Sequence, residues 1–146
     1  MRDYKPKGAP TIIPSVTVSD VEKAIDFYTK AFGFKASSAL MKQGDQVAYA
    51  ELDFADGRIM VFREGAYDMK SKTPSHSGQQ PPMSLYIYCQ DVDAHHKQAV
   101  AAGAQQMHPL EDMFWGDRMY MVADPDGHHW TFAQNVADFD PSKVPS

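Results

Sequence analysis

The sequence predicts an α+β fold built from two tandem modules, each with the order strand-helix-strand-strand-strand. Two observations predict it. A Gly-Asp pair opens a hydrophobic run and an Asp-Gly pair closes it twice, within Gly44–Phe62 and again within Trp115–Asn135. A strand pattern and a glycine-terminated helical pattern precede each run. Two duplicated copies that cannot each bury a core alone would pair and share one. We therefore expect one domain over residues 1–146, with a curved, partly closed eight-stranded sheet around a cup and the helices outside.

Bulk composition narrows the class of protein. A chain of 146 residues suits one domain, and its net charge of −5 lacks the dense cationic face that nucleic acids require. The single cysteine, Cys89, excludes an intramolecular disulfide. No apolar run approaches the ~20 residues of a membrane span, and the first ten residues lack the apolar core of a signal peptide. We expect a cytoplasmic protein with neither a nucleic-acid nor a membrane partner.

The first module covers about residues 11–64. Alternating residues predict a strand over Thr11–Val18. Ser19 and Glu22 form a capping-box pattern, which predicts that Ser19 begins a helix whose apolar stripe ends at Gly33. Three further strands are predicted, at about Phe34–Met41, Val47–Phe54 and Arg58–Arg63.

The second module, about residues 83–135, repeats this order after a linker. Residues 65–82 are rich in Gly, Ser, Pro and Gln and predict that linker. The predicted elements of the module are a strand at Met83–Cys89, a helix from Asp91 to Gly103, and strands at Gln105–Pro109, Arg118–Ala123 and His128–Gln134. The tail, residues 136–146, has little to bury, and we expect it to be loosely held.

Three segments resemble the vicinal oxygen chelate superfamily, which includes glyoxalase I, extradiol dioxygenases and bleomycin-resistance proteins. They are VTVSDVEKAIDFYTKAFGF, YCQDVDAHHKQAVAAGA and FWGDRMYMVADPDGHHWTF. The resemblance covers about residues 11–136, and the linker is most similar to that of the PhnB-like branch. It implies two paired modules around a cup-shaped site, and a homodimer. The pattern fits both a cup closed within one chain and a cup formed by modules that swap across a dimer.

The resemblance also implies that enzymes of this superfamily bind one divalent metal through His, Gln or Glu at four positions. Spacing from the capping aspartates and the turn glycines places these positions at Ile13, Ser84, Val61 and Thr131. None of these side chains is a good ligand for a divalent ion. Neighbouring histidines do not replace them, because adjacent strand residues such as His128 and His129 point to opposite faces. We therefore predict no metal cofactor, and a divalent metal at a shifted site is the alternative.

Strand alternation predicts which side chains line the cup. If the helices cover the face that holds Val16, Val18, Leu85, Ile87, Trp130 and Phe132, the opposite face lines it. That face holds Ser15, Thr17, Ile59, Val61, Arg63, Tyr86, Tyr88, His129 and Thr131. This mixture of aromatic and placed polar groups is typical of a ligand pocket.

Phe114 and Trp115 lie in the loop before a cup strand, and two interpretations stand. Trp115 closes over a planar ligand, as aromatic loop residues do in related resistance proteins. Alternatively, Phe114 and Trp115 cover the rim or fill a dimer contact.

Two classes of function fit these residues. The first is a metal-free binder of a small aromatic or amphipathic molecule, which sequesters an antibiotic or natural product. The second is an enzyme of glyoxalase, isomerase or dioxygenase type with an atypical metal site, or a metal-free acid–base catalyst. His129 and Glu51 are the candidate acid–base residues, because imidazole titrates near neutral pH and Glu51 can point inward.

Overall fold

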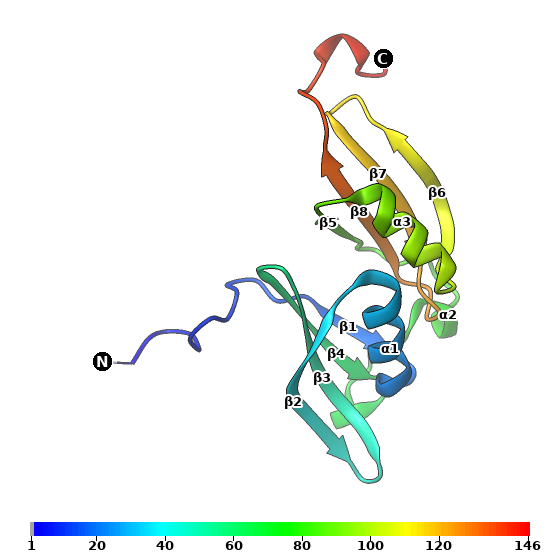
Figure 1. The fold of residues 1–146 in the computed structure, drawn as a ribbon. Coiled ribbons are helices and arrows are strands. Elements are labelled where there is room, and N and C mark those ends of the chain that lie inside the picture. The colour runs from blue at the N-terminus through cyan, green and yellow to red at the C-terminus, as the bar shows by residue number, and fades with distance from the viewer. Residues whose placement is uncertain (1) are drawn as a thin grey trace. The chain divides into compact units, whose positions relative to one another are not determined.

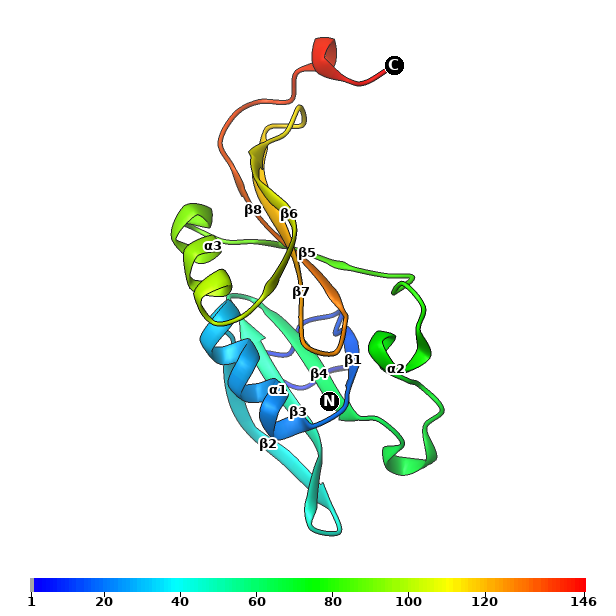
Figure 2. The ribbon, with the colours of Figure 1, turned by 90° about the vertical axis from the view of Figure 1, so that its right-hand side faces the viewer.

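The computed structural model describes residues 2–146, which separate into two compact units on either side of the bond between Thr73 and Pro74. Each unit holds one four-stranded mixed sheet with a helix against one face (Figures 1 and 2). The α+β class and the two βαβββ modules are therefore confirmed. The eight strands are hydrogen-bonded as two sheets of four, and neither sheet closes on itself.

The first unit has the sheet order β1-β4-β3-β2, with β1 parallel to β4 and the other neighbours antiparallel. A turn of π-helix, η1, continues helix α1 without a break, and Gly33 ends it at a φ of 81°. The elements are β1 (Ser15–Val18), α1 (Val21–Phe27), η1 (Tyr28–Phe32), β2 (Lys35–Gln43), β3 (Gln46–Phe54), β4 (Gly57–Arg63) and η2 (Ala66–Asp68).

Helix α1 begins one residue later than the sequence pattern predicts. The carboxylate of Asp20 accepts a hydrogen bond from the backbone N–H of Lys23 at 3.1 Å, so Asp20 is the capping residue and the capping box on Ser19 is wrong. An aspartate caps as well as a serine does and adds a negative charge that favours the helix N-terminus. Val21, Ala24, Tyr28, Ala31 and Phe32 then form the buried stripe against the sheet.

The second unit repeats the topology as β5-β8-β7-β6, with β5 parallel to β8. A short helix, α2, precedes its first strand, and its N-terminus is bound to the β7–β8 turn through the N–H of Ser75 and the carbonyl of Asp126. The elements are α2 (Pro74–Ser77), β5 (Leu85–Tyr88), α3 (Val92–Ala101), β6 (Gln105–Asp112), β7 (Asp117–Ala123), β8 (His129–Asn135) and η3 (Pro141–Lys143).

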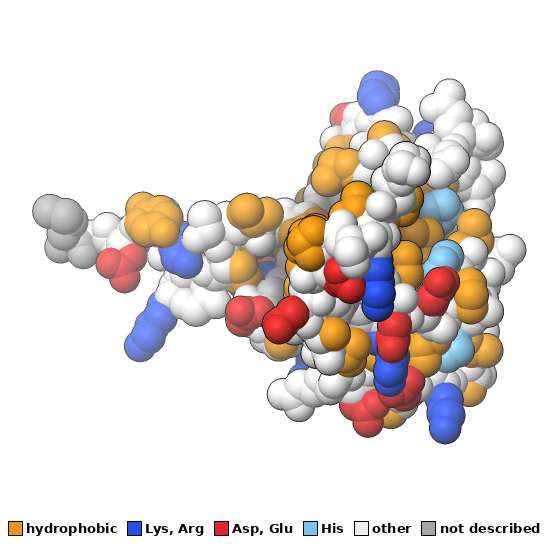
Figure 3. Space-filling view, turned by 90° about the horizontal axis from the view of Figure 1, so that it is seen from above, with side chains coloured by type: hydrophobic (Ala, Val, Ile, Leu, Met, Phe, Trp, Pro, Cys, Tyr) orange, Lys and Arg blue, Asp and Glu red, His pale blue; other side chains and the backbone are white. Residues whose placement is uncertain are grey.

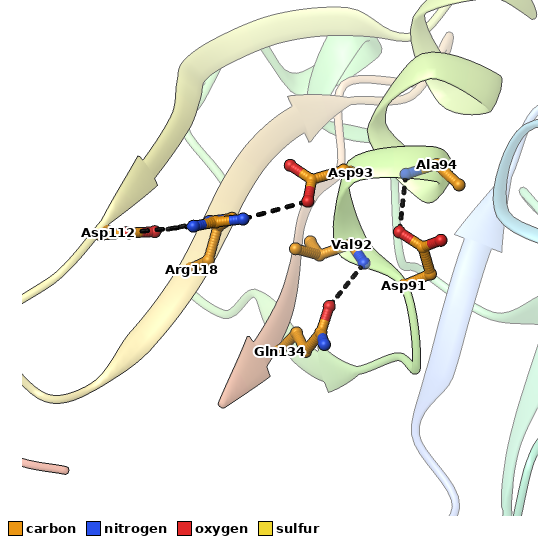
Figure 4. A network of polar contacts seen from close by, with 7 residues as sticks. All are labelled: Asp91, Val92, Asp93, Ala94, Asp112, Arg118 and Gln134. Carbon is orange, nitrogen blue, oxygen red and sulfur yellow. Dashed lines mark hydrogen bonds and ion pairs between the residues drawn. The ribbon is translucent and has the colours of Figure 1, made fainter. Parts of the chain in front are cut away.

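A polar network holds α3 against its sheet (Figure 4). Gln134 of β8 accepts a hydrogen bond from the backbone N–H of Val92, and Asp91 caps the helix at Ala94. Arg118 of β7 donates to Asp93 of α3 at 3.0 Å and to Asp112 of β6 at 2.6 Å. One guanidinium therefore joins the helix to two strands.

The adjacent histidines of α3 are structural, as predicted. His95 packs with its ring centroid 4.2 Å from that of Phe132, and its Nδ1 lies 2.6 Å from the Tyr120 hydroxyl. The ring of His96 also meets that of Tyr120, edge to face at 4.8 Å, and its Nε2 lies 2.6 Å from the side-chain oxygen of Gln106. The bonded nitrogens of the two imidazoles therefore face different side chains, Tyr120 and Gln106, and do not converge on one ion.

Among residues 2–146, every helix falls short of the length and apolarity that crossing a bilayer requires. On the face drawn in Figure 3, acidic and basic side chains are interspersed among hydrophobic ones. That face therefore presents a mixed charge.

Candidate functional site

The open face of the second sheet, the face opposite α3, carries the residues that strand alternation assigned to it. Tyr86 and Tyr88 pair with Thr131 and Ala133 of β8, so these four side chains share one face. Leu85 and Ile87 pair with Trp130 and Phe132 on the other face, which α3 covers. Tyr86, Tyr88, His129 and Thr131 therefore share one face, as alternation predicts, and that this face lines a cup stays a prediction.

One buried carboxylate organises this face. The hydroxyls of Tyr86 and Tyr88 both donate to Oδ2 of Asp117 at 2.7 Å, and Nδ2 of Asn135 donates to Oδ1 at 3.0 Å. The indole Nε1–H of Trp115 donates to the Tyr86 hydroxyl at 3.0 Å. We call Tyr86, Tyr88, Trp115, Asp117 and Asn135 the tyrosine–aspartate cluster. Asp117 is only 1% exposed, whereas Tyr86 is 44% and Tyr88 59% exposed, so the cluster presents aromatic rings to solvent above a hidden charge.

The protonation states of the cluster follow from these contacts. Burial raises the pKa of Asp117, but hydrogen bonds from Tyr86, Asn135 and Tyr88 outweigh it, so the pKa is lowered from its ordinary value. Burial and the hydrogen bond to Asp117 raise the pKa of Tyr86 to about 12, and the same hydrogen bond, with burial, raises that of Tyr88. At neutral pH the cluster therefore holds one carboxylate and two neutral phenols.

The lowered pKa of Asp117 predicts a specific acid sensitivity. A carboxyl whose pKa is lower in the folded state contributes stability that is present above its unfolded value and is lost as the pH falls through the folded value. We expect the stability advantage of the native protein over Asp117→Asn to shrink as the pH is lowered below the ordinary aspartate value of 3.8. Urea unfolding at pH 7, 5, 4 and 3 measures it. A gap that stays constant or widens in acid would contradict the assignment.

The loop that bears Trp115 is tied to the C-terminal tail. The backbone N–H groups of Val136 and Ala137 both donate to the carbonyl of Gly116, and that of Asp140 donates to the carbonyl of Phe114. The rings of Phe114 and Phe139 meet edge to face at 6.1 Å. The expectation of a loosely held tail is therefore wrong for residues 136–140, because backbone hydrogen bonds, which composition does not reveal, dock this segment on the loop.

Three lining assignments in the first unit are wrong. Ser15 and Thr17 pair with Met60 and Phe62, whereas Val16 and Val18 pair with Val61 and Arg63. Ile59, Val61 and Arg63 thus lie on the face covered by α1, where Ile59 and Val61 are buried. The cause is the length of the turn. The first side chain on the helix-covered face comes two positions after Gly57 but three positions after Gly127. The same count from the turn glycine therefore reaches opposite faces of the sheet in the two copies.

Arg63 sits instead at the start of α1, beside a small hollow of about 180 Å³. Its guanidinium donates to Gln43 at 3.1 Å, and its Nε is buried without a hydrogen-bond partner among the described residues.

The open face of the first sheet carries Glu51, one of the two candidate acid–base residues. Glu51 pairs with Met60 and accepts a hydrogen bond from the Tyr49 hydroxyl at 2.7 Å, and Arg58 lies 3.8 Å away. Burial and this hydrogen bond raise the pKa of Tyr49 to about 12. Glu51 is therefore held in an ion-pair network with its charge already partnered.

His129, the other candidate, belongs to the second unit and lines a surface hollow of about 470 Å³. The hollow lies between the β7–β8 turn and the α2 segment. The remaining residues that line it are Pro74, Ser75, Gly78, Gln79, Gln80, Pro81, Met107 and Gly127.

Comparison with known proteins identifies the family. A model of the Glyoxalase/Bleomycin resistance protein/Dioxygenase superfamily matches residues 12–132, which include every strand of both sheets up to the middle of β8. The chain belongs to this superfamily. The PhnB-like branch within it stays a prediction.

The relatives of this chain include a bleomycin resistance protein. The chain is 34% identical over 138 residues to an uncharacterised protein of Mycobacterium bovis, and the alignment covers 92% of this chain and 90% of that protein. It is 27% identical to a bleomycin resistance protein of Geobacillus stearothermophilus, over 85% of this chain and 96% of that protein.

Solved structures of the superfamily share the fold. TioX from Micromonospora sp. ML1 superposes with a TM-score of 0.72 at 29% identity, over 88% of this chain and all of that one. TnmS3, an antibiotic binding protein from Streptomyces sp. CB03234, superposes with a TM-score of 0.61 at 25% identity, over 87% of this chain and 98% of that one.

The residues at the four metal positions that the resemblance implies do not fit a divalent ion. Ile13 and Val61 are aliphatic and have no donor atom, and Ser84 and Thr131 offer only neutral hydroxyls. If the count is shifted by one residue, the position in β4 falls on Met60, which lies on the open face. Met60 offers only a thioether. Among residues 2–146, no group of three or more His, Cys, Asp or Glu side chains is placed to hold a metal ion.

Asp117 is the functional candidate that the sequence analysis missed. In the sequence it stands out only as half of a repeated Gly-Asp pair. Its counterpart Asp45 is exposed, whereas Asp117 is buried as the first residue of β7. The available signal was a lone carboxylate at the start of a strand pattern in a module whose first strand carries two tyrosines on one face.

Proposed function

We propose that this chain is a metal-free small-molecule binding protein that sequesters an aromatic or amphipathic compound, such as an antibiotic or another natural product. The tyrosine–aspartate cluster carries the proposal. Its two exposed phenol rings and the indole of Trp115 form a stacking surface whose members are fixed by hydrogen bonds before any ligand arrives. A surface fixed in advance loses little conformational freedom on binding, which favours affinity.

The relatives support the same class of function. One is named as a bleomycin resistance protein and one as an antibiotic binding protein, and both align over most of this chain. The side chains at the metal positions support a metal-free state, since they leave a divalent ion without anionic or imidazole ligands. We also propose a homodimer, as the resemblance to the superfamily implies, and a cytoplasmic location.

The enzymatic alternative, acid–base chemistry at His129 or Glu51 or a metal at an atypical site, takes second place. Glu51 is engaged by Tyr49 and Arg58, which hold its carboxylate in an ion pair. His129 lines a hollow, but among residues 2–146 no hydrogen-bonding partner orients its ring. A general base is normally held in a defined orientation by such a partner.

A fluorescence titration tests the binding proposal. The chain has two tryptophans, and Trp130 is buried with 1% exposure, so quenching by a ligand at the cluster should come from Trp115. We expect bleomycin or planar aromatic natural products from a small panel to quench the emission and raise the melting temperature. Trp115→Ala should abolish the quenching and weaken affinity about tenfold or more, as the loss of a central aromatic contact does.

Tyr4→Ala is the matched control, because Tyr4 is 86% exposed in the N-terminal segment and should leave the titration unchanged. Quenching that persists in Trp115→Ala would contradict binding at the cluster. Elemental analysis of protein purified without chelator tests the metal-free state, and one tightly held divalent ion per chain would overturn it.

A further inference from the structure

Every hydrogen-bond donor of the tyrosine–aspartate cluster is already used inside the protein. Each tyrosine hydroxyl has one hydrogen, and both hydrogens go to Asp117. The single N–H of Trp115 goes to the Tyr86 oxygen. The amide of Asn135 donates to the carboxylate of Asp117 and to the carbonyls of Gly116 and Ala137.

The groups of the cluster that remain available to a ligand are therefore hydrogen-bond acceptors. A phenolic oxygen that donates its hydrogen can still accept. The oxygen of Tyr86 already accepts from Trp115, whereas that of Tyr88 has no donor among residues 2–146, and both side chains are exposed. This polarity cannot reverse while Asp117 is ionised, because a carboxylate only accepts. The lowered pKa of Asp117 and the raised pKa values of both tyrosines keep this arrangement at neutral pH.

The charge of the cluster points the same way. All three groups that donate to Asp117 are neutral, so its negative charge is not cancelled by a cation in contact. The guanidinium at the next position, Arg118, is bound to Asp112 and Asp93 on the helix-covered side of the sheet. Aromatic faces attract cations, and a phenol that donates to an anion is polarised in the direction that strengthens this attraction.

We propose that the tyrosine–aspartate cluster selects ligands that present a cationic nitrogen with N–H donors, such as a protonated amine or an amidinium beside an aromatic ring. This inference rests on the proposed binding function and adds the charge class of the ligand. A carboxylate or phosphate at the same place would meet lone pairs, electron-rich rings and a buried negative charge. A cationic group at that place would donate to a phenolic oxygen and lie against the aromatic rings.

Three probes with one ring system test the inference: 2-naphthylmethylammonium, 2-naphthalenemethanol and 2-naphthoate, each titrated by calorimetry at pH 7. We expect the ammonium to bind at least about tenfold more tightly than the carboxylate, with the alcohol between them. In Asp117→Asn this preference should fall to about twofold or less. Asp3→Asn, which removes the same charge from an exposed N-terminal position, should keep the full preference.

Tyr88→Phe guards against a folding defect in Asp117→Asn. It keeps the exposed ring and the Tyr86–Asp117 hydrogen bond while removing one acceptor, so the ammonium should lose affinity more than the alcohol does. The inference is overturned if naphthoate binds as tightly as the ammonium, or if Asp3→Asn lowers the preference as much as Asp117→Asn. If the neutral or anionic probe binds best and does so through Trp115, the binding function stands and only the charge class fails. If no probe or panel compound binds, both fail.

Discussion

Asp124→Ala should lower the free energy of unfolding by about 3 kcal/mol, whereas Asp56→Ala, at the corresponding turn of the first module, should lower it by less than about 0.5 kcal/mol. Asp124 is only 6% exposed. Its Oδ1 accepts the backbone N–H groups of Asp126 and His128 at 3.0 Å, and its Oδ2 accepts the indole N–H of Trp130 at 2.9 Å. Removing the carboxylate leaves these donors without an acceptor.

The Trp130 indole decides the size of the effect. Its ring is 1% exposed and stacks near Phe132 in the core beneath α3, so its N–H cannot turn to water when Asp124 is lost. A buried donor without a partner costs about 1–3 kcal/mol, in addition to the loosening of the turn. Asp56 is exposed, so its loss strands no comparable donor.

Urea unfolding of the two variants measures the difference, with circular dichroism as the probe. Asp124→Asn serves as the intermediate case, because its amide oxygen can still accept the two backbone N–H groups but its NH₂ would face the indole N–H. We expect its cost to lie between those of the two alanine variants. Equal costs for Asp56→Ala and Asp124→Ala would show that the carboxylate does not support the core.

The order of elements could be predicted from the sequence because it depends on local patterns. Alternation, glycine stops and duplicated Asp-Gly turns lie within a few residues of what they determine, and all eight strands appear near their predicted places. Orientation was predictable where a strand carried a clear alternation, as at Leu85, Tyr86, Ile87 and Tyr88. It failed on β4, because one added residue in the second turn changes which side chains of the next strand share a face.

The site was only half predictable for a related reason. Tyr86, Tyr88 and Trp115 were found from residue type and alternation. The group that joins them, Asp117, lies 31 residues after Tyr86 and 29 after Tyr88 in sequence, and no local pattern connects them. Bulges added a further limit: β6 extends through Pro109 to Asp112 with register shifts on both sides of His108, whereas the pattern predicts a strand that ends at Pro109.

The junction between the Trp115 loop and the tail gives the second large effect. Gly116→Ala should cost about 3 kcal/mol or more, or release the tail from the loop, because a Cβ at this position would overlap the carbonyl of Ala137. Gly116 also has a φ of +100°, where a side chain is strained. Gly103 has nearly the same φ, +99°, but open space around it, so Gly103→Ala isolates the strain alone and should cost only about 1 kcal/mol.

Hydrogen exchange distinguishes release of the tail from global destabilisation. In Gly116→Ala, the amides of Val136 and Ala137, both bonded to the Gly116 carbonyl, should exchange much faster, while those of β8 keep most of their protection. Asn135 also donates to the carbonyls of Gly116 and Ala137, so release of the tail should weaken its hydrogen bond to Asp117. Ligand quenching of Trp115 should weaken as a result. If the two glycine variants behave alike in stability, exchange and quenching, the tail neither holds the loop nor supports the cluster.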